Sequence, residues 1–138
     1  MRLLAGIAVC VVMATAGFAT AGRNEPHTVE ITIENSTYST DDIEVHAGET
    51  VTFVITNTDP ISHEFIVGDD ALQERHEKGT ERYHDARPTE VTIPPGQQVT
   101  TTFAFDASSG IDVGEHNYYA CHLPGHFDYG MVGGFEIR

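Results

Sequence analysis

Short stretches of alternating apolar and polar residues dominate this sequence and constrain its fold most strongly. Val29, Ile31 and Ile33 alternate with polar residues, and the same two-residue period runs through 51–56. This period predicts half-buried β-strands, because successive side chains of a strand point to opposite faces of the sheet. The expected strands are 29–34, 43–45, 51–56, 64–67, 91–93, 99–105, 116–121 and 132–137. Short strands separated by turn residues predict an all-β fold, either a β-sandwich or a small barrel.

One segment, 69–87, interrupts the alternation. It is rich in charged residues and helix formers, so we expect a short helical insertion near 70–87, with a surface helix over 71–78. His76 and His84 lie in this segment. We expect both to be solvated surface histidines; a secondary metal site or a partner-docking face is the alternative.

The first 21 residues have the features of a signal peptide. Arg2 precedes an apolar run that is too short for a stable membrane span, and 19–21 reads Ala-Thr-Ala, a small-x-small cleavage site. We therefore expect a signal peptide (1–21), a linker (22–27) and one domain (28–138), exported to the periplasm, the cell surface or the medium. Cleavage removes Cys10 and leaves Cys121 as the single cysteine, which cannot form an internal disulfide.

The charge of the chain limits its partners. The formal net charge is −14, with 21 acidic residues and only 7 Lys and Arg. Nucleic acid and anionic lipid surfaces are therefore excluded as expected partners. We expect a monomer without a membrane span in its mature form. The negative charge is a solubility feature or, alternatively, steers the protein toward a basic redox partner.

Three metal donors of graded softness lie close together near the C-terminus. Cys121, His126 and Met131 have the spacing C-x4-H-x4-M, and Gly125 and Gly130 each precede one of the donors. A thiolate and a thioether favour copper, and imidazole accepts both Cu(I) and Cu(II). Zinc favours a closed set of Cys and His and has little use for a thioether. Glycine suits a tight loop that folds back on one ion.

A fourth ligand has to come from another part of the chain. His63 is the first choice, because it follows the turn at Asp59-Pro60 and starts an expected strand. His116 and His122 remain alternatives. His122 adjoins Cys121 and should point away from a metal held by that sulfur, since neighbours in an extended segment face opposite sides.

The stretch from His63 to Met131 resembles the cupredoxin family of type 1 blue-copper proteins. In that family an upstream histidine is joined by a cysteine, a histidine and a methionine around the last inter-strand loop. The pattern C-x-x-P-G-H-x-x-x-G-M-x-G carries the resemblance, which covers essentially the whole domain. It implies one type 1 copper ion with His63, Cys121 and His126 in the equatorial plane and Met131 as axial ligand. It also implies a Greek-key sandwich of seven or eight strands.

The sequence departs from the family at the residue after the upstream histidine. Several members have Asn or Ser there, whose side chain pins the ligand loop; this chain has Glu64. The carboxylate is expected either to point outward or to lower the copper potential. The resemblance implies a carrier of single electrons between redox partner proteins, and copper delivery or buffering is the alternative. Four filled ligand positions argue against an enzyme, because catalysis at a metal needs a vacant position.

Overall fold

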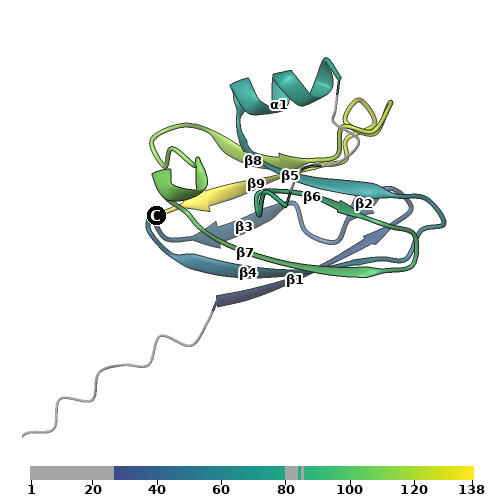
Figure 1. The fold of residues 1–138 in the computed structure, drawn as a ribbon, viewed down its shortest axis with the longest axis horizontal. Coiled ribbons are helices and arrows are strands. Elements are labelled where there is room, and N and C mark those ends of the chain that lie inside the picture. Colours follow the sequence, from purple (N-terminus) through teal and green to yellow (C-terminus); the bar gives the residue numbers. More distant parts are fainter. Residues whose placement is uncertain (1–26, 80–83, 85) are drawn as a thin grey trace, which may run out of the picture.

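The structure is a computed structural model, and it describes residues 27–79, 84 and 86–138. The expected signal peptide, most of the linker and part of the segment after Gly79 lie outside the described residues. Two β-sheets face each other (Figure 1). One sheet has the order β2-β1-β4-β7 and the other the order β3-β9-β8-β5-β6. The bounds are β1 (His27–Glu34), β2 (Thr37–Tyr38), β3 (Asp42–Val45), β4 (Thr50–Asn57), β5 (His63–Asp69), β6 (Glu90–Ile93), β7 (Gln98–Ala104), β8 (Asn117–Ala120) and β9 (Val132–Ile137).

The expected alternation is confirmed in the sheets. Along β4 every second residue is buried, beginning with Val51, and its apolar side chains point between the two sheets. β1 and β4 pair in parallel, as do β3 and β9, and the remaining strand pairs are antiparallel. All eight expected strands are present, and no end differs by more than two residues. A ninth strand, β2, has two residues and is too short to show a period.

Aromatic rings fill much of the space between the sheets. Phe53 stacks on Phe103 with 5.1 Å between ring centroids, and Phe65 lies 5.1 Å from Tyr119. The Tyr119 ring lies so close to Gly133 in β9 that a Cβ atom there would be 2.2 Å from it. Glycine at this position therefore allows the ring to pack against the backbone of the neighbouring strand.

Among the described residues there is one α-helix, α1 (Asp70–Glu77), which follows β5 directly and lies on the outer face of the five-stranded sheet (Figure 1). Its position agrees with the helix expected over 71–78. Asp69 caps the N-terminus, accepting a hydrogen bond of 2.8 Å from the amide of Leu72. Gln73 fastens the helix to the sheet, donating to the carbonyls of Ile66 and Tyr118. In the part of the chain that the structure describes, no helix has the length and apolar character needed to cross a membrane.

Candidate metal centre

Pairing of β5 with β8 brings the upstream histidine to the C-terminal loop. Ile66 lies opposite Ala120 in this antiparallel pair, so the loop 121–131 begins beside the start of β5. The loop then closes on itself: the amide of Cys121 donates to the carbonyl of Met131 (3.1 Å), and the amide of Met131 to that of His126 (3.0 Å). These backbone bonds fix three of the four expected ligands relative to one another.

Two glycines allow the loop to turn this tightly. Gly125 and Gly130 have φ values of 85° and 90°, in the left-handed region that favours glycine. Each directly precedes an expected ligand, as the sequence analysis anticipated.

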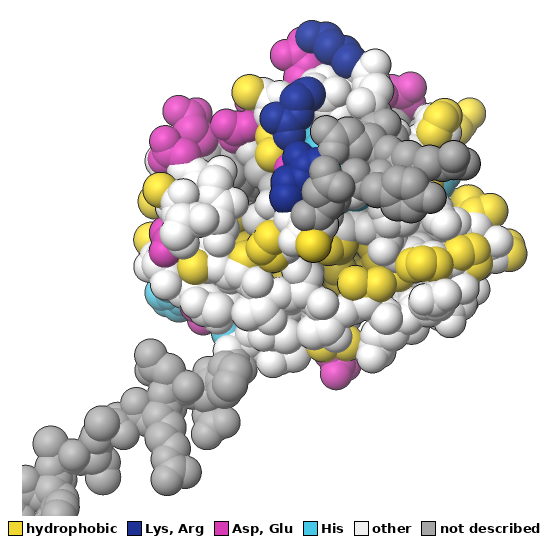
Figure 2. Space-filling view, in the orientation of Figure 1, with side chains coloured by type: hydrophobic (Ala, Val, Ile, Leu, Met, Phe, Trp, Pro, Cys, Tyr) yellow, Lys and Arg dark blue, Asp and Glu magenta, His cyan; other side chains and the backbone are white. Residues whose placement is uncertain are grey.

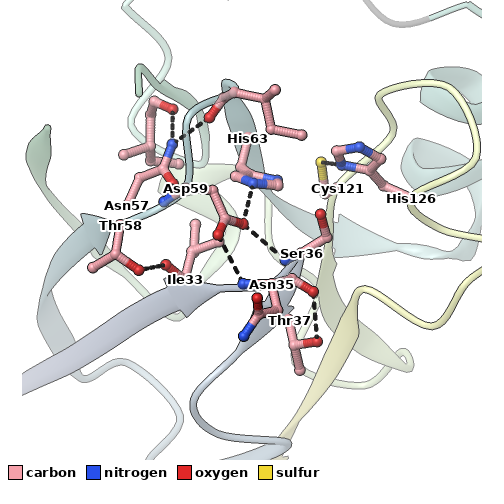
Figure 3. A network of polar contacts seen from close by, with 12 residues as sticks. Ile33, Asn35, Ser36, Thr37, Asn57, Thr58, Asp59, His63, Cys121 and His126 are labelled. Atoms are coloured by element: carbon pink, nitrogen blue, oxygen red, sulfur yellow. Dashed lines mark hydrogen bonds and ion pairs between the residues drawn. The ribbon is translucent and has the colours of Figure 1, made fainter. Parts of the chain in front are cut away.

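Three of the four expected donors, His63, Cys121 and His126, lie close together (Figure 3). The donor atoms of His63, Cys121 and His126 all lie within 4.8 Å of one another. The distance from Cys121 Sγ to His126 Nδ1 is 3.2 Å, and the rings of His63 and His126 are 5.0 Å apart. His63 and Cys121 are fully buried, whereas His126 is partly exposed. The Met131 side chain is buried in the adjoining core.

Asp59 orients the upstream ligand. Its Oδ2 lies 2.9 Å from His63 Nε2, so this ring nitrogen carries the proton and donates to the carboxylate. The other ring nitrogen, Nδ1, is buried and has no hydrogen-bond partner among the described residues. A buried imidazole lone pair without a donor is what a metal ligand requires.

Asp59 is in turn held by the tight turn between β1 and β2. The amides of Asn35 and Ser36 donate to its two carboxylate oxygens at 2.7 and 2.8 Å, and both residues have a positive φ. Burial alone would raise the pKa of Asp59, but these two amides and the His63 ring outweigh it and the pKa is lowered. Burial lowers the pKa of His63, which keeps its ring neutral despite the carboxylate. From the sequence alone, Asp59 is recognisable only as part of a turn.

Asn57 holds the chain that leads to His63. Its side-chain amide donates to three carbonyls, those of Ile61, Ile93 and Pro94, at 2.8 to 3.1 Å. One buried side chain thus ties the segment before β5 to the end of β6 (Figure 3).

Two backbone amides point at the Cys121 sulfur. The amide of Glu64 lies 3.4 Å from Sγ, and the amide of Leu123 also donates to it. Burial raises the pKa of the Cys121 thiol to about 11, although both amides act in the opposite direction. The amides stabilise negative charge on sulfur, so they favour the thiolate that a bound metal requires.

The residues at this centre fit a type 1 copper site. Two imidazoles and a thiolate converge, and a buried methionine follows in the same loop. His63 presents a buried, unpaired nitrogen to the thiolate side of the cluster. This donor set matches the His₂Cys plane with a weak axial thioether that characterises blue copper.

The alternatives for the upstream ligand lie elsewhere. His116 is exposed and lies 3.5 Å from Asp70. His122 is buried, but its ring points away from the sulfur, and its two nitrogens lie 2.8 and 2.6 Å from carboxylate and amide oxygens of Glu77 and Gln73.

Glu64 is also buried, and its carboxylate is directed neither at solvent nor at the sulfur. Its Oε2 accepts from the amide of His122 at 3.2 Å, so the carboxylate holds the start of the ligand loop.

The expectation that His76 and His84 are solvated is wrong. Their exposed fractions are 2% and 5%, because α1 packs its inner face, including His76, against the sheet. Both lie beside Glu90 of β6, and the donor atoms of the three residues are within 4.8 Å of one another. The charged composition of 69–87 suggested an exposed segment, but here the charges pair with one another under the helix.

Sequence comparisons place the chain among copper proteins. Residues 4–104 match the model of the cupredoxin-like domain family, a range that ends before the three loop donors. The copper-resistant cuproprotein CopI of Pseudomonas aeruginosa is 27% identical over 80% of this chain and 75% of its own length. CopI proteins of Vibrio cholerae and Rubrivivax gelatinosus are 30% and 33% identical over 70% of this chain; the alignments cover 55% and 56% of those proteins.

Solved structures support the fold over the whole described domain. Auracyanin from Roseiflexus castenholzii superposes with a TM-score of 0.63 at 20% identity, covering 81% of this chain and 97% of that one. Auracyanin A from Chloroflexus aurantiacus, described as a "blue" copper protein, gives 0.61 at 20% identity and covers 83% and 100%.

Proposed function

This chain belongs to the cupredoxin-like domain family, and we propose that it is an exported blue-copper protein that carries single electrons between redox partners. The observation that carries the proposal is the convergence of His63, Cys121 and His126, with Met131 adjoining them. Bound copper would supply a one-electron Cu(I)/Cu(II) couple at this position.

Rapid electron exchange requires ligands that hardly move when the oxidation state changes. His63 is fixed by Asp59, which is itself held by two amides of a tight turn. The loop donors are fixed by the backbone bonds among Cys121, His126 and Met131. Ligands held by hydrogen bonds on a strand and in a closed loop cannot relax freely, so the arrangement of the four ligands is set by the fold rather than by the ion.

The partly exposed edge of His126 is the proposed route for electrons. Pro124 and Tyr129 are exposed in the same loop, and Leu123 and Phe127 are half-buried. Hydrophobic side chains reach the surface at the end of the molecule where this loop lies (Figures 1 and 2). A small apolar surface beside a buried redox centre suits brief docking, and the net charge of −14 favours a basic partner.

Copper delivery or buffering is the second candidate function. It is favoured by the relatives, three of which are named copper-resistant cuproproteins. A donor of copper must release its ion to an acceptor, whereas an electron carrier retains it through many cycles.

One experiment separates the two functions. Copper-loaded protein is titrated with a graded set of redox mediators while its visible absorption is followed, and it is then incubated with a copper-free acceptor. An electron carrier bleaches and recovers reversibly and keeps its copper. Irreversible bleaching with transfer of the ion to the acceptor would favour delivery and contradict the carrier proposal.

A further inference from the structure

A second group of metal donors lies beneath α1. It is separate from the site of His63, Cys121, His126 and Met131, which we call the cysteine cage. It consists of His76 of α1, His84 of the following connection and Glu90 at the start of β6, with exposed fractions of 2%, 5% and 4%. Glu90 Oε2 lies 3.1 Å from His76 Nε2 and 3.6 Å from His84 Nδ1. In a tetrahedral site with bonds of about 2.0–2.1 Å, neighbouring donor atoms are about 3.3 Å apart. The donors are therefore already spaced to share one ion.

His84 shows the same arrangement as the upstream ligand of the cysteine cage. Its Nε2 lies 3.2 Å from Glu64 Oε1, so this nitrogen carries the proton and donates to a buried carboxylate. Its Nδ1 is buried and has no hydrogen-bond partner among the described residues. A buried polar nitrogen without a hydrogen-bond partner is unfavourable, and a metal bond would remove that cost. A carboxylate behind a metal-binding histidine is the usual device that fixes the tautomer and the ring.

We propose that His76, His84 and Glu90 form a second metal site for a divalent first-row cation, with Cu²⁺ bound most tightly. Two imidazoles and one carboxylate contain no soft sulfur, so the site suits Cu²⁺ or Zn²⁺ rather than Cu(I). The general affinity order of divalent metals places Cu²⁺ above Zn²⁺ at such donors. Both imidazoles must be neutral to bind the ion, so the affinity should fall as the pH is lowered.

Arginine side chains already compensate the charge of Glu90 and would compete with the cation. Arg87 Nη1 lies 3.0 Å from Glu90 Oε2, and Arg75 Nη2 lies 3.6 Å from Oε1. Basic side chains on this face of the molecule gather on the α1 side (Figure 2). The Arg87 side chain is 36% exposed, so its head group can turn to solvent and release Oε2 to an incoming ion. His122 stacks against His76, but its two nitrogens face Glu77 and Gln73, so it supports the site without being a ligand.

Glu64 connects the proposed site to the cysteine cage. One carboxylate oxygen of Glu64 accepts a hydrogen bond from the His84 ring, and the other accepts from the amide of His122. The backbone amide of Glu64 points at Cys121 Sγ. A cation bound to His84 would polarise its hydrogen bond to Glu64 and so alter the hydrogen bonds around the sulfur. A shift of the visible absorption on binding the second ion is therefore expected; this optical effect alone rests on the proposed function.

Metal stoichiometry of the mature protein tests the site directly. Protein holding one copper in the cysteine cage is titrated with Cu²⁺, and in a separate arm with Zn²⁺, by calorimetry and by metal analysis after desalting. We expect one further equivalent of Cu²⁺, a weaker equivalent of Zn²⁺, and competition between the two ions. Failure to bind a second equivalent of either ion would overturn the proposal.

Matched histidine variants show where the second ion binds. We expect His84→Gln to weaken the second equivalent by more than about 100-fold, since even residues that only orient a ligand contribute about 10- to 100-fold. His116→Gln, which removes an exposed histidine outside both clusters, should leave both equivalents unchanged. A second equivalent that persists in His84→Gln and is lost in His116→Gln would contradict the assignment.

Two further variants keep the test decisive. Arg87→Gln should tighten the second equivalent, because it removes the cation that competes for Glu90; weaker binding in a folded Arg87→Gln protein would contradict the site. Cys121→Ser should abolish the first copper site and retain a His84-dependent equivalent. In Cys121→Ser, loss of the first equivalent alone is the expected result. If no protein variant shows an equivalent that depends on His84, this inference is refuted and the proposed function is not.

Discussion

The cysteine cage and the cluster under α1 use the same device to present a histidine. In each, one ring nitrogen is tied to a carboxylate, the half-buried Asp59 for His63 and the buried Glu64 for His84. The other ring nitrogen is buried and has no hydrogen-bond partner among the described residues. The two regions differ in the donors that surround the histidine: sulfur in the first, a carboxylate in the second. The carboxylate therefore fixes the histidine ring, whereas the chemical type of the neighbouring donor determines which ion the site binds and which chemistry it supports.

The two regions also differ in rigidity. The cage lies between paired strands and is closed by backbone hydrogen bonds from Cys121 and Met131. The cluster under α1 draws its donors from a helix, a connection and the first residue of a strand. A cage that holds its geometry suits electron transfer, and a cluster that can adjust suits reversible binding of a cation.

The largest expected effect comes from removing the sulfur of the cage. Cys121→Ser should abolish intense visible absorption of the copper-loaded protein, because the colour of blue copper depends on the copper–thiolate bond. His84→Gln should retain the colour, since its histidine belongs to the other cluster. Absorption spectra at matched copper content check both, and retention of the band in Cys121→Ser would refute the ligand assignment.

The next largest effects are expected from neutralising the two supporting carboxylates, each of which should weaken metal binding mainly at its own site. Asp59→Asn should weaken copper binding in the cage by about 10- to 100-fold, because the amide no longer fixes the His63 tautomer. Glu64→Gln should weaken the second ion by a similar factor and shift the absorption of the first. Asp106→Asn, which alters a partly exposed capping residue of the 3-10 helix Ala107–Ser109, is the control. Equal effects of all three changes would show that the carboxylates act only through stability.

The buried thiol should give the metal-free protein a distinctive response to alkali. Because the pKa of Cys121 is raised to about 11, the folded protein keeps this proton where the unfolded chain loses it. Stability from this group is complete below the unfolded pKa near 9 and is lost as the pH rises toward 11. The loss is at most about 2–3 kcal/mol. Denaturant unfolding of wild type and Cys121→Ser across this range measures it; identical slopes would contradict the buried thiol.

A smaller change is expected at the axial position. Met131→Leu should keep the cage coloured, because the thiolate and both imidazoles remain. The reduction potential should rise, because loss of an electron-pair donor destabilises the more highly charged Cu(II) ion more than Cu(I). Electrochemistry of the copper-loaded variant measures the shift. An unchanged potential would show that Met131 packs in the core without coordinating.

Much of the fold could be predicted from local pattern, because the strands bury every second residue. Along β4, the alternation starting at Val51 is visible in the sequence and matches the burial in the structure. β2 escaped notice because two residues cannot show a period, although Tyr38 buries its ring against Phe65 and Tyr119.

The cysteine cage could be predicted because its donors differ in chemistry from ordinary core residues and lie at a recognisable spacing. The role of Asp59 in orienting His63 could not be predicted. Asp59 is held by the positive-φ turn at Asn35 and Ser36, which lies over twenty residues away in the sequence. The cluster under α1 was predicted only as an alternative to solvated histidines, for a related reason. His76 and His84 sit in a charged segment, and only the packing of α1 on the sheet reveals that they are buried.

X-ray absorption at the copper edge tests the central claim most directly, applied to protein holding one copper in its oxidised and then its reduced state. The account predicts one short sulfur bond and two nitrogen bonds in both states, with nearly unchanged lengths, because the fold holds His63, Cys121 and His126 in place. A coordination shell without sulfur, or one that changes its ligands on reduction, would contradict it.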